Sequence, residues 1–368
     1  MALVMDKRLS VDHSNEDRTP AEFQPYDIGE YTLKAPLTSN KSGFSKWGFC
    51  WKGDTEFFIK EFLSPVYPDD SVELSAVMRE RRIDECIRWF EAKSRIYNTI
   101  VQAQTGNLVV PISFFKYESR FYLVTQKVSE SAMDFAVLNR FDMAHKLIVM
   151  KVLANSFAKL AERNIVHADV KPDNLLIKQT NGGFFTMKII DFDASYLADM
   201  PPEPDEVQGD TVYYAPETLL YIIRQPAELT PKVDVFAMGI IFHQVLTGKM
   251  PQIKPEYDYI YEAVLSGDPP VLEPTLPDDY RALLEGMLQK DPKDRLSMQQ
   301  VFDELVRLDG KRQEEEAANP PAPVPEVCAA EPEQPAAAAE SAETEPAPAA
   351  PAEPAQRGFL NATDDDLW

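Results

Sequence analysis

The sequence predicts an α+β fold, and three observations indicate it. Short apolar runs such as Tyr31–Leu33 and Phe57–Lys60 stand beside polar or turn-forming residues and are typical of strands. The segment Met143–Arg163 carries apolar residues at helical spacing and predicts a buried helix. The polar stretch His167–Asn174 follows that helix, and two apolar runs joined by a turn at 181–183 then predict a strand hairpin.

Size and charge limit the classes of protein to consider. The chain has 368 residues, 44% of them hydrophobic, which suffices for one domain of about 280 residues with tails. The formal net charge is −23, which argues against nucleic acid as the main partner. Residues 313–368 hold 13 acidic residues and one arginine, so −12 of that charge lies in the tail. Cys50, Cys86 and Cys328 are too few and too scattered for a disulfide framework or a zinc site.

Targeting signals are not evident in the sequence. The segment 1–17 carries early charges and no apolar core, so we expect no signal peptide. No apolar run approaches the length of a membrane-spanning helix, so we expect no membrane partner. Together with the few, scattered cysteines, these features favour a cytoplasmic protein.

The stretch His167–Asn174 and the hairpin after it collect the residues with the most specific chemistry. Asp169 can take a proton, and Lys171, two residues later, can neutralise a phosphate. Asn174 and Asp191 can hold a hard cation through oxygen. These side chains suit phosphoryl transfer, in which positioning and charge neutralisation supply most of the catalysis.

This stretch resembles the catalytic loop of the eukaryotic-type serine/threonine protein kinases, in which H-R-D-x-K-x-x-N is followed by D-F-G. Ala168 stands where that family has an arginine before the catalytic aspartate, and Asp193 stands where it has the glycine. The resemblance implies a bilobal fold, with a small β-rich N-lobe at about 27–125 and a larger helical C-lobe at about 129–308. It also implies ATP and Mg²⁺, or Mn²⁺ in its place, as cofactors.

The N-terminal part departs from the family pattern in one motif. Residues 1–26 are polar and mixed, and we expect a flexible arm. Counting back from Lys60, Gly43 falls at the third glycine of the family's G-x-G-x-x-G, while Thr38 and Asn40 take the first two positions. A glycine lets the backbone approach a phosphate closely, so this degenerate loop predicts weaker or altered nucleotide contacts.

Lys60 ends an apolar strand similar to the family's V-A-I-K, which implies that it pairs with the nucleotide phosphates. A long helix should follow, with an apolar stripe that includes Phe90 and Tyr97. In the family a glutamate of this helix orients the strand lysine. Glu80 and Glu91 both flank the stripe, and we predict Glu91, because it better fits the distance to the strand that follows the helix.

The remaining nucleotide contacts are implied by the resemblance alone. Thr125 would end the last strand of the N-lobe at the gatekeeper position. Gln126 and Val128 would belong to the hinge that offers backbone groups to an adenine, and Leu176 would line the base from the C-lobe.

Several later motifs also match the family. Residues 194–208 form a proline-rich, acidic activation segment that leads to Ala-Pro-Glu, ending at Glu217. Asp234 resembles the aspartate that holds the catalytic-loop backbone, and Arg295 should pair with Glu217. A capping box formed by Ser297 and Gln300 predicts the start of the last helix.

The C-terminal region has two parts. Residues 309–356 predict a disordered linker rich in proline, alanine and glutamate. Apolar and aromatic residues return in 357–368, which we interpret as a docking or phosphorylation peptide. Thr363 with Asp366 three residues later resembles a ligand of forkhead-associated domains, which bind phosphopeptides.

The sequence therefore predicts an ATP-dependent serine/threonine protein kinase that acts on a protein substrate. Asp169, Lys171, Lys60 and Glu91 are the predicted catalytic residues, and Asn174 with Asp191 the predicted metal ligands. Because Ala168 cannot hold a phosphate, we expect activity without activation-segment phosphorylation. The alternative is a pseudokinase that acts as a scaffold or nucleotide-binding interaction module, which the degenerate glycine-rich loop favours.

Overall fold

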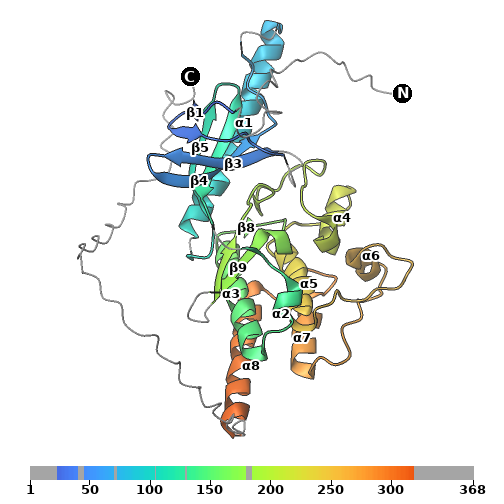
Figure 1. Cartoon of the computed structure of the whole chain (residues 1–368). Helices are drawn as coiled ribbons and strands as arrows, with labels where there is room; N and C mark the ends of the chain where they lie inside the picture. The colour runs from blue at the N-terminus through green and yellow to red at the C-terminus, as the bar shows by residue number, and fades with distance from the viewer. Residues whose placement is uncertain are drawn as a thin grey trace, which may run out of the picture.

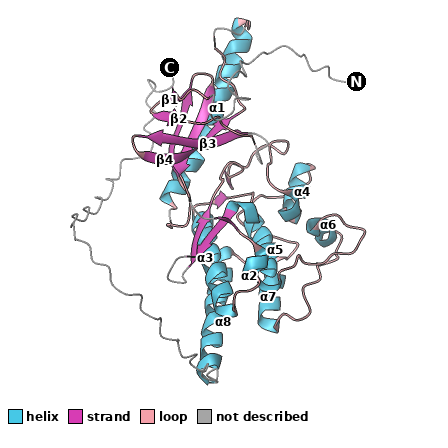
Figure 2. Ribbon diagram, viewed as in Figure 1, coloured by secondary structure: helices cyan, strands magenta, loops and turns pink. Residues whose placement is uncertain are grey.

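A computed structural model of the chain describes residues 23–39, 45–69, 73–103, 105–128, 131–179 and 185–318. Within them the chain forms a strand-rich N-terminal lobe and a helical C-terminal lobe (Figures 1 and 2). The predicted α+β, two-lobed fold is thereby confirmed. The predictions on Asn40, Gly43 and the hairpin turn at 181–183 lie outside the described residues, as do those on the C-terminal tail from residue 319 onward.

The N-lobe is built on one antiparallel six-stranded sheet of order β1-β2-β3-β4-β6-β5. Its strands are β1 (Tyr26–Ile28), β2 (Tyr31–Leu33), β3 (Ser45–Lys52), β4 (Thr55–Phe62), β5 (Pro111–Tyr117) and β6 (Arg120–Gln126). Alternate residues of these strands bury one face, on which Ile28, Leu33 and Ile59 are fully buried.

The first strand shows that the predicted N-terminal boundary was placed too late. Phe23 is buried in the same cluster as Ile28, and Tyr26 already pairs with Leu33. Residues 23–26 therefore belong to the folded lobe and not to an arm, because the aromatic side chain of Phe23 removes apolar surface from water.

A single long helix, α1 (Ala76–Gln102), packs against this sheet (Figure 1). The hydroxyl of Ser75 accepts a hydrogen bond from the Met78 amide and caps the helix. Phe90 stacks on Phe114 of β5 at 4.8 Å between ring centroids, and Tyr97 meets the same ring edge-on at 5.0 Å. These aromatic contacts fix the rotation of α1 about its axis, and with it the side chains that face the C-lobe.

The C-lobe contains the remaining elements. Its helices are α2 (Phe135–Leu138), α3 (Met143–Glu162), α4 (Pro216–Ile222), α5 (Lys232–Thr247), α6 (Ile260–Leu265), α7 (Asp278–Met287) and α8 (Met298–Ala318). Its short strands are β7 (Ser131–Ala132), β8 (Ile165–Val166), β9 (Leu175–Gln179), β10 (Phe185–Ile189) and β11 (Tyr196–Leu197), with 3₁₀ turns η1 (Pro172–Asn174) and η2 (Thr211–Tyr213).

Helix α5 is the centre of the C-lobe, since its side chains are buried on nearly every face. It packs on α7 so closely that a β-carbon at Gly239 would lie 3.0 Å from the β-carbon of Met287. Helix α3 ends as predicted, because Asn164 directly after it adopts a left-handed φ of 60°. That stop turns the chain from α3 into β8 and the loop that follows.

The last helix corrects the predicted end of the domain. Helix α8 does not stop near residue 308 but continues to Ala318. The carboxylate of Asp309 is buried between Lys151 of α3, at 2.6 Å, and Arg312, at 2.8 Å. These ion pairs tie the last turns of α8 to α3, so residues 309–318 are part of the fold and not of a linker.

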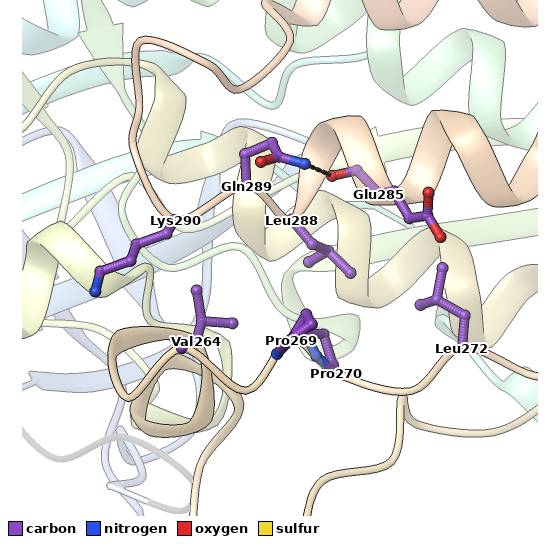
Figure 3. A pocket seen from close by; sticks show the side chains of 9 residues that line it. Val264, Pro269, Pro270, Leu272, Glu285, Leu288, Gln289 and Lys290 are labelled. Atoms are coloured by element: carbon purple, nitrogen blue, oxygen red, sulfur yellow. Dashed lines mark hydrogen bonds between the residues drawn. The ribbon is translucent and has the colours of Figure 1, made fainter.

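Two further features complete the description. A cavity of about 210 Å³ lies between α6 and α7 and is lined by apolar side chains such as Val264, Leu272 and Leu288, with Lys290 at its edge (Figure 3). None of its lining residues is a predicted site residue. Among the described helices, none is long and apolar enough to cross a membrane.

Candidate active site

Asp234 of α5 fixes the backbone of the predicted catalytic loop by hydrogen bonds. Its carboxylate accepts hydrogen bonds from the amides of His167, at 2.8 Å, and Ala168, at 3.0 Å. Burial raises the pKa of Asp234, against the opposing effect of His167 and of the two amides. The two bonds hold Ala168 at a φ of 67°, a left-handed conformation that costs a residue with a β-carbon about 1–2 kcal/mol. The loop shape therefore depends on α5, as the resemblance implied.

His167 is fully buried and links the loop to the segment that carries Asp191. Its Nε2 lies 3.1 Å from the carbonyl oxygen of Ile190, which can only accept, so Nε2 carries the proton. Its Nδ1 accepts from the amide of Asp169 at 3.3 Å. The Ser195 hydroxyl donates to the carbonyl of His167 at 3.1 Å. This network joins the loop to both ends of the 190–195 segment.

Asp169 lies at the centre of the loop, and both of its carboxylate oxygens accept hydrogen bonds. Oδ2 accepts from Lys171 at 2.8 Å and from the Asn174 amide at 2.9 Å, and Oδ1 accepts from the backbone amide of Asp210 at 2.9 Å. Burial would lower the pKa of Lys171, but the hydrogen bond and charge of Asp169 outweigh it and raise the pKa. The structure thus brings together Asp169, Lys171 and Asn174 as predicted.

Asn174 and Asp191, the predicted metal ligands, lie on neighbouring segments that a backbone hydrogen bond joins. Asn174 donates its amide nitrogen to Asp169, to the carbonyl at 2.8 Å and to the carboxylate, which leaves its amide oxygen as the group for a cation. The amide of Ile190, next to Asp191, donates to the carbonyl of Asn174 at 3.0 Å and keeps the two residues adjacent. Burial would raise the pKa of Asp191, but the ammonium of Lys60 lowers it below its usual value.

This donor set fits Mg²⁺ better than a metal held by protein alone. The described residues contain no group of three or more histidine, cysteine, aspartate or glutamate side chains that could hold a metal ion. Mg²⁺ is usually bound by one or two carboxylates together with water and substrate phosphates. One carboxylate and one amide oxygen therefore match a nucleotide-bound Mg²⁺ and would not suffice for a structural ion.

Lys60 projects from β4 to this site, but its partners differ from the prediction. Its ammonium lies 2.9 Å from Asp191 and 2.9 Å from Asp193, and both contacts are ion pairs. Glu91 is exposed on α1 and is not brought to Lys60, and Glu80 is exposed as well. The predicted pairing of Lys60 with Glu91 is therefore wrong for this structure.

The helix residue that faces the site is Lys93. Its ammonium donates a hydrogen bond to the backbone carbonyl of Asp193. Burial lowers the pKa of Lys93, and the nearby Asp193 and Asp191 carboxylates only partly oppose this. Glu91 is two residues away, which places it about 200° around the helix. The periodicity contained this signal, since Lys93 lies three residues after Phe90 and four before Tyr97, both on the buried stripe.

The same face of the sheet carries aromatic side chains that the sequence analysis did not single out. Cross-strand partners share a face, and Trp47 of β3 pairs with Lys60, while Phe49 pairs with Phe58. Trp47 stacks on Phe58 at 5.8 Å, and Phe49 meets both rings edge-on. We call Trp47, Phe49 and Phe58 the aromatic triad. Alternation in β3 and β4 was the signal that could have placed it beside Lys60.

One of the predicted base-binding residues, Thr125, lies next to the triad. Thr125 is buried in β6 opposite Phe58. Gln126 and Val128 follow it into the connection between the lobes, where Gln126 is exposed. Leu176 is buried in β9 and pairs with Ala132 of β7. The nucleotide contacts of Thr125, Gln126, Val128 and Leu176 remain predictions.

The activation segment is ordered and contacts the catalytic loop. Gly209 has a φ of 133°, and a β-carbon there would lie 2.5 Å from the carbonyl oxygen of Ala168, so only glycine fits. Downstream, Arg295 binds Glu217 in a fully buried, two-armed ion pair at 2.6 and 2.9 Å. This confirms the predicted Arg295–Glu217 pair and anchors the end of the segment.

Comparison with known proteins agrees with this geometry. Residues 81–305 match the family model described as the protein kinase domain. The chain is 27% identical over 226 residues to the serine/threonine-protein kinase DCLK3 of Mus musculus, a match that covers 58% of this chain and 28% of that protein. It is 28% identical over 170 residues to the serine/threonine-protein kinase Pkn1 of Myxococcus xanthus, covering 45% of this chain and 23% of that one. It is 25% identical over 197 residues to an Aurora kinase of Eremothecium gossypii, covering 53% and 51%.

One family model covers more than half of the chain, and the structure contains two contacts that the family motifs implied, the Arg295–Glu217 ion pair and the hydrogen bonds of Asp234 to the loop. The chain belongs to the protein kinase family, and its domain is of the serine/threonine type. The matched segment spans only about a quarter of the length of the first two relatives.

Proposed function

We propose that this protein is an ATP-dependent serine/threonine protein kinase. The observation that carries the proposal is the hydrogen-bonded set of Asp169, Lys171 and Asn174, with Lys60 and Asp191 joined by an ion pair at its edge. Each member has a chemical role in phosphoryl transfer, and the kinase relatives supply the reaction class. The substrate would be the hydroxyl of a protein serine or threonine.

In this proposal the chain's own residues position and neutralise the reacting groups. Asp169 accepts the proton of the substrate hydroxyl, whose oxygen bonds to the γ-phosphorus while the bond from that phosphorus to the β–γ bridging oxygen breaks and ADP leaves. Lys171 and Lys60 neutralise phosphate charge. Asn174 and Asp191 would hold Mg²⁺, which supplies charge neutralisation at the phosphate oxygens when it is bound.

We further propose that activity does not require phosphorylation of the activation segment. Ala168 offers no cation to a phosphate, and the segment is instead joined to the loop by the Gly209–Ala168 contact and the Asp210–Asp169 hydrogen bond. Asp205 of the segment already pairs with Arg224 at 3.2 Å. The backbone contacts of Gly209 and Asp210 and the carboxylate of Asp205 would thus hold the activation segment in place, as a bound phosphate does in kinases that require phosphorylation.

Phosphatase treatment should leave the activity of the purified protein within about twofold of the untreated enzyme, because no phosphate-binding cation lies before Asp169. The measurement is initial-rate transfer of labelled γ-phosphate to a generic peptide, with Mg²⁺ and with Mn²⁺. Thr211→Ala is the matched variant, since Thr211 is exposed, whereas Ser195 is buried and its hydroxyl already donates to His167. A large loss of activity on dephosphorylation, traced to Thr211, would contradict the proposal.

A second function has specific observations in its favour. Lys60 is held by two carboxylates, and the aromatic triad places large rings on the face that a nucleotide would use. Both features would suit a pseudokinase scaffold that binds proteins without transferring phosphate. The same turnover assay separates the two functions, because a scaffold shows no transfer with either metal while it remains folded.

We also propose that the C-terminal tip, residues 357–368, recruits a phosphopeptide-binding partner once Thr363 is phosphorylated. The support is its sequence, since apolar residues return beside an acidic run, and Asp366 lies three residues after the threonine. A tail that served only solubility would need neither Phe359 nor Trp368.

Truncation after Pro354 should leave phosphorylation of a free peptide unchanged and abolish binding to a purified forkhead-associated domain, because it removes the tip and two linker residues but no part of the kinase domain. Thr363→Ala in the full chain is the control that removes the phosphate acceptor alone. Mass spectrometry of the active protein gives the modification state of Thr363. An unmodified Thr363, together with equal binding by the truncated chain, would contradict recruitment by phosphorylation.

A further inference from the structure

Lys60 forms ion pairs with both Asp191 and Asp193, and the two carboxylates differ in what they can do when a nucleotide binds. Asp191 is the candidate cation ligand, and its side chain is the more accessible of the two, 35% exposed against 22% for Asp193. A cation on Asp191 would compete with Lys60 for that carboxylate. Asp193, which is not needed for the cation, would then be the remaining partner of Lys60.

The face of α1 that meets Asp193 carries hydrogen-bond donors and no acid. Lys93 donates to the backbone carbonyl of Asp193, and Tyr97, one turn later on the same face, is fully buried beside it. Burial raises the pKa of Tyr97, and the Asp193 carboxylate raises it further. The ammonium of Lys93 and the hydroxyl of Tyr97 are complementary to a carboxylate at position 193. This face of α1 offers no carboxylate of its own with which Lys60 could pair.

Two buried polar atoms at this contact lack hydrogen bonds within the described residues. They are Oδ1 of Asp193 and the hydroxyl of Tyr97. Buried polar atoms are almost always paired, and the side-chain interaction with Asp193 that raises the pKa of Tyr97 identifies these two groups as each other's partner. A small movement of α1 would let Tyr97 donate to Asp193 and hold that carboxylate against Lys60.

We propose that Asp193 is the residue that positions Lys60 for the nucleotide phosphates, and that Lys93 supplies the balancing charge from α1. In effect, the acid has moved from the helix to the segment after β10, and a lysine takes its place on the helix. The inference rests on the proposed kinase function, because it gives Asp193 the task that the sequence analysis assigned to a helix glutamate. It also explains why the glycine of the family motif is replaced at position 193, since the carboxylate of Asp193 there has a role in positioning Lys60.

Asp193 or Lys93 alone, without the other, would leave the buried charges at this site unbalanced. Asp193 without Lys93 would add a second carboxylate beside Asp191 with one lysine to balance both. Lys93 without Asp193 would bury two ammonium groups around the single Asp191 carboxylate. Uncompensated buried charge is strongly destabilising, so the two residues should be functionally coupled.

The test is a double-mutant cycle in the full chain with Lys93→Glu, Asp193→Gly and the two combined. Each single variant should lower kcat/KM for ATP by about tenfold or more, and the combined variant should recover to within about threefold of wild type, because Glu at 93 and Gly at 193 restore the family arrangement. ATP affinity measured by calorimetry with Mg²⁺ gives a readout independent of turnover. Arg88→Glu changes the same charge on the exposed side of α1 and is the matched control.

The outcomes separate the inference from the proposed function. Full activity of Asp193→Gly, or additive losses in the combined variant with melting temperatures unchanged, would overturn the positioning role in an active kinase. If the wild type binds ATP but transfers no phosphate, the proposed function is wrong. The ATP affinities of the same four proteins, measured by calorimetry, then still test the role of Asp193. If a variant unfolds, Asp193→Asn removes the charge at nearly constant shape and should also lower ATP affinity. A wild-type chain that does not bind ATP overturns both proposals.

Discussion

Replacement of Asp191 by asparagine should lower the rate of phosphoryl transfer by about 100-fold or more, because it removes the carboxylate that we propose binds the cation together with Asn174. Asparagine is the better choice because Asp191 has a left-handed φ of 63°, which asparagine adopts at a lower cost than alanine. The measurement is initial-rate phosphate transfer at saturating ATP with Mg²⁺ and with Mn²⁺.

Thermal unfolding and circular dichroism of the variant provide the control. Asp191→Ala should show the same loss of activity with an added loss of stability of about 1–2 kcal/mol, because the left-handed backbone conformation then carries its full cost. Transfer at the wild-type rate by a folded Asp191→Asn variant would be incompatible with the catalytic assignment.

Arg295→Ala should destabilise the fold by about 3–5 kcal/mol, because it leaves the buried carboxylate of Glu217 without its partner. The Arg295 side chain is 0% exposed and that of Glu217 4% exposed. The guanidinium also donates to the carbonyls of Lys232, at 2.7 Å, and Gln289, at 3.0 Å, and it lies 5.1 Å from the Phe236 ring. Chemical denaturation of the full chain measures the free energy of unfolding.

The matched control is Arg224→Ala, which removes an exposed ion pair with Asp205. Both side chains are mostly exposed, at 66% and 77%, so this change should cost no more than about 1 kcal/mol. Equal losses in the two variants would show that burial of the Arg295–Glu217 pair does not determine its contribution.

Much of the C-lobe could be predicted because its signals are local. The turn conformation of Asn164, the capping box of Ser297 and Gln300 and the hairpin of β9 and β10 each depend on neighbouring residues, and each is confirmed. The contacts of Asp234 and Arg295 were also predicted, since their motifs imply fixed partners.

The predictions that failed depend on interactions between distant segments. Glu91 was chosen from distance along the chain, but the rotation of α1 is set by Phe90 and Tyr97 against Phe114, and that rotation turns Lys93 to the site. The C-terminal boundary was placed where composition changes, whereas α8 continues because Asp309 meets Lys151, more than 150 residues earlier in the chain. Composition contains neither contact, and the periodicity of α1 places Lys93 on the buried face without showing that this face meets Asp193.

The aromatic triad provides an intrinsic fluorescence signal, because it contains Trp47. Trp47 lies on the sheet face of Lys60, across from it in β3, and its ring stacks on Phe58. The emission of an indole depends on the polarity and the stacking partners around it, and a purine held against Phe58 would alter both. Occupancy of the site can therefore be followed through tryptophan fluorescence without a label, provided that Trp51 and Trp89, which lie elsewhere in the N-lobe, and Trp368 near the C-terminus are replaced by phenylalanine.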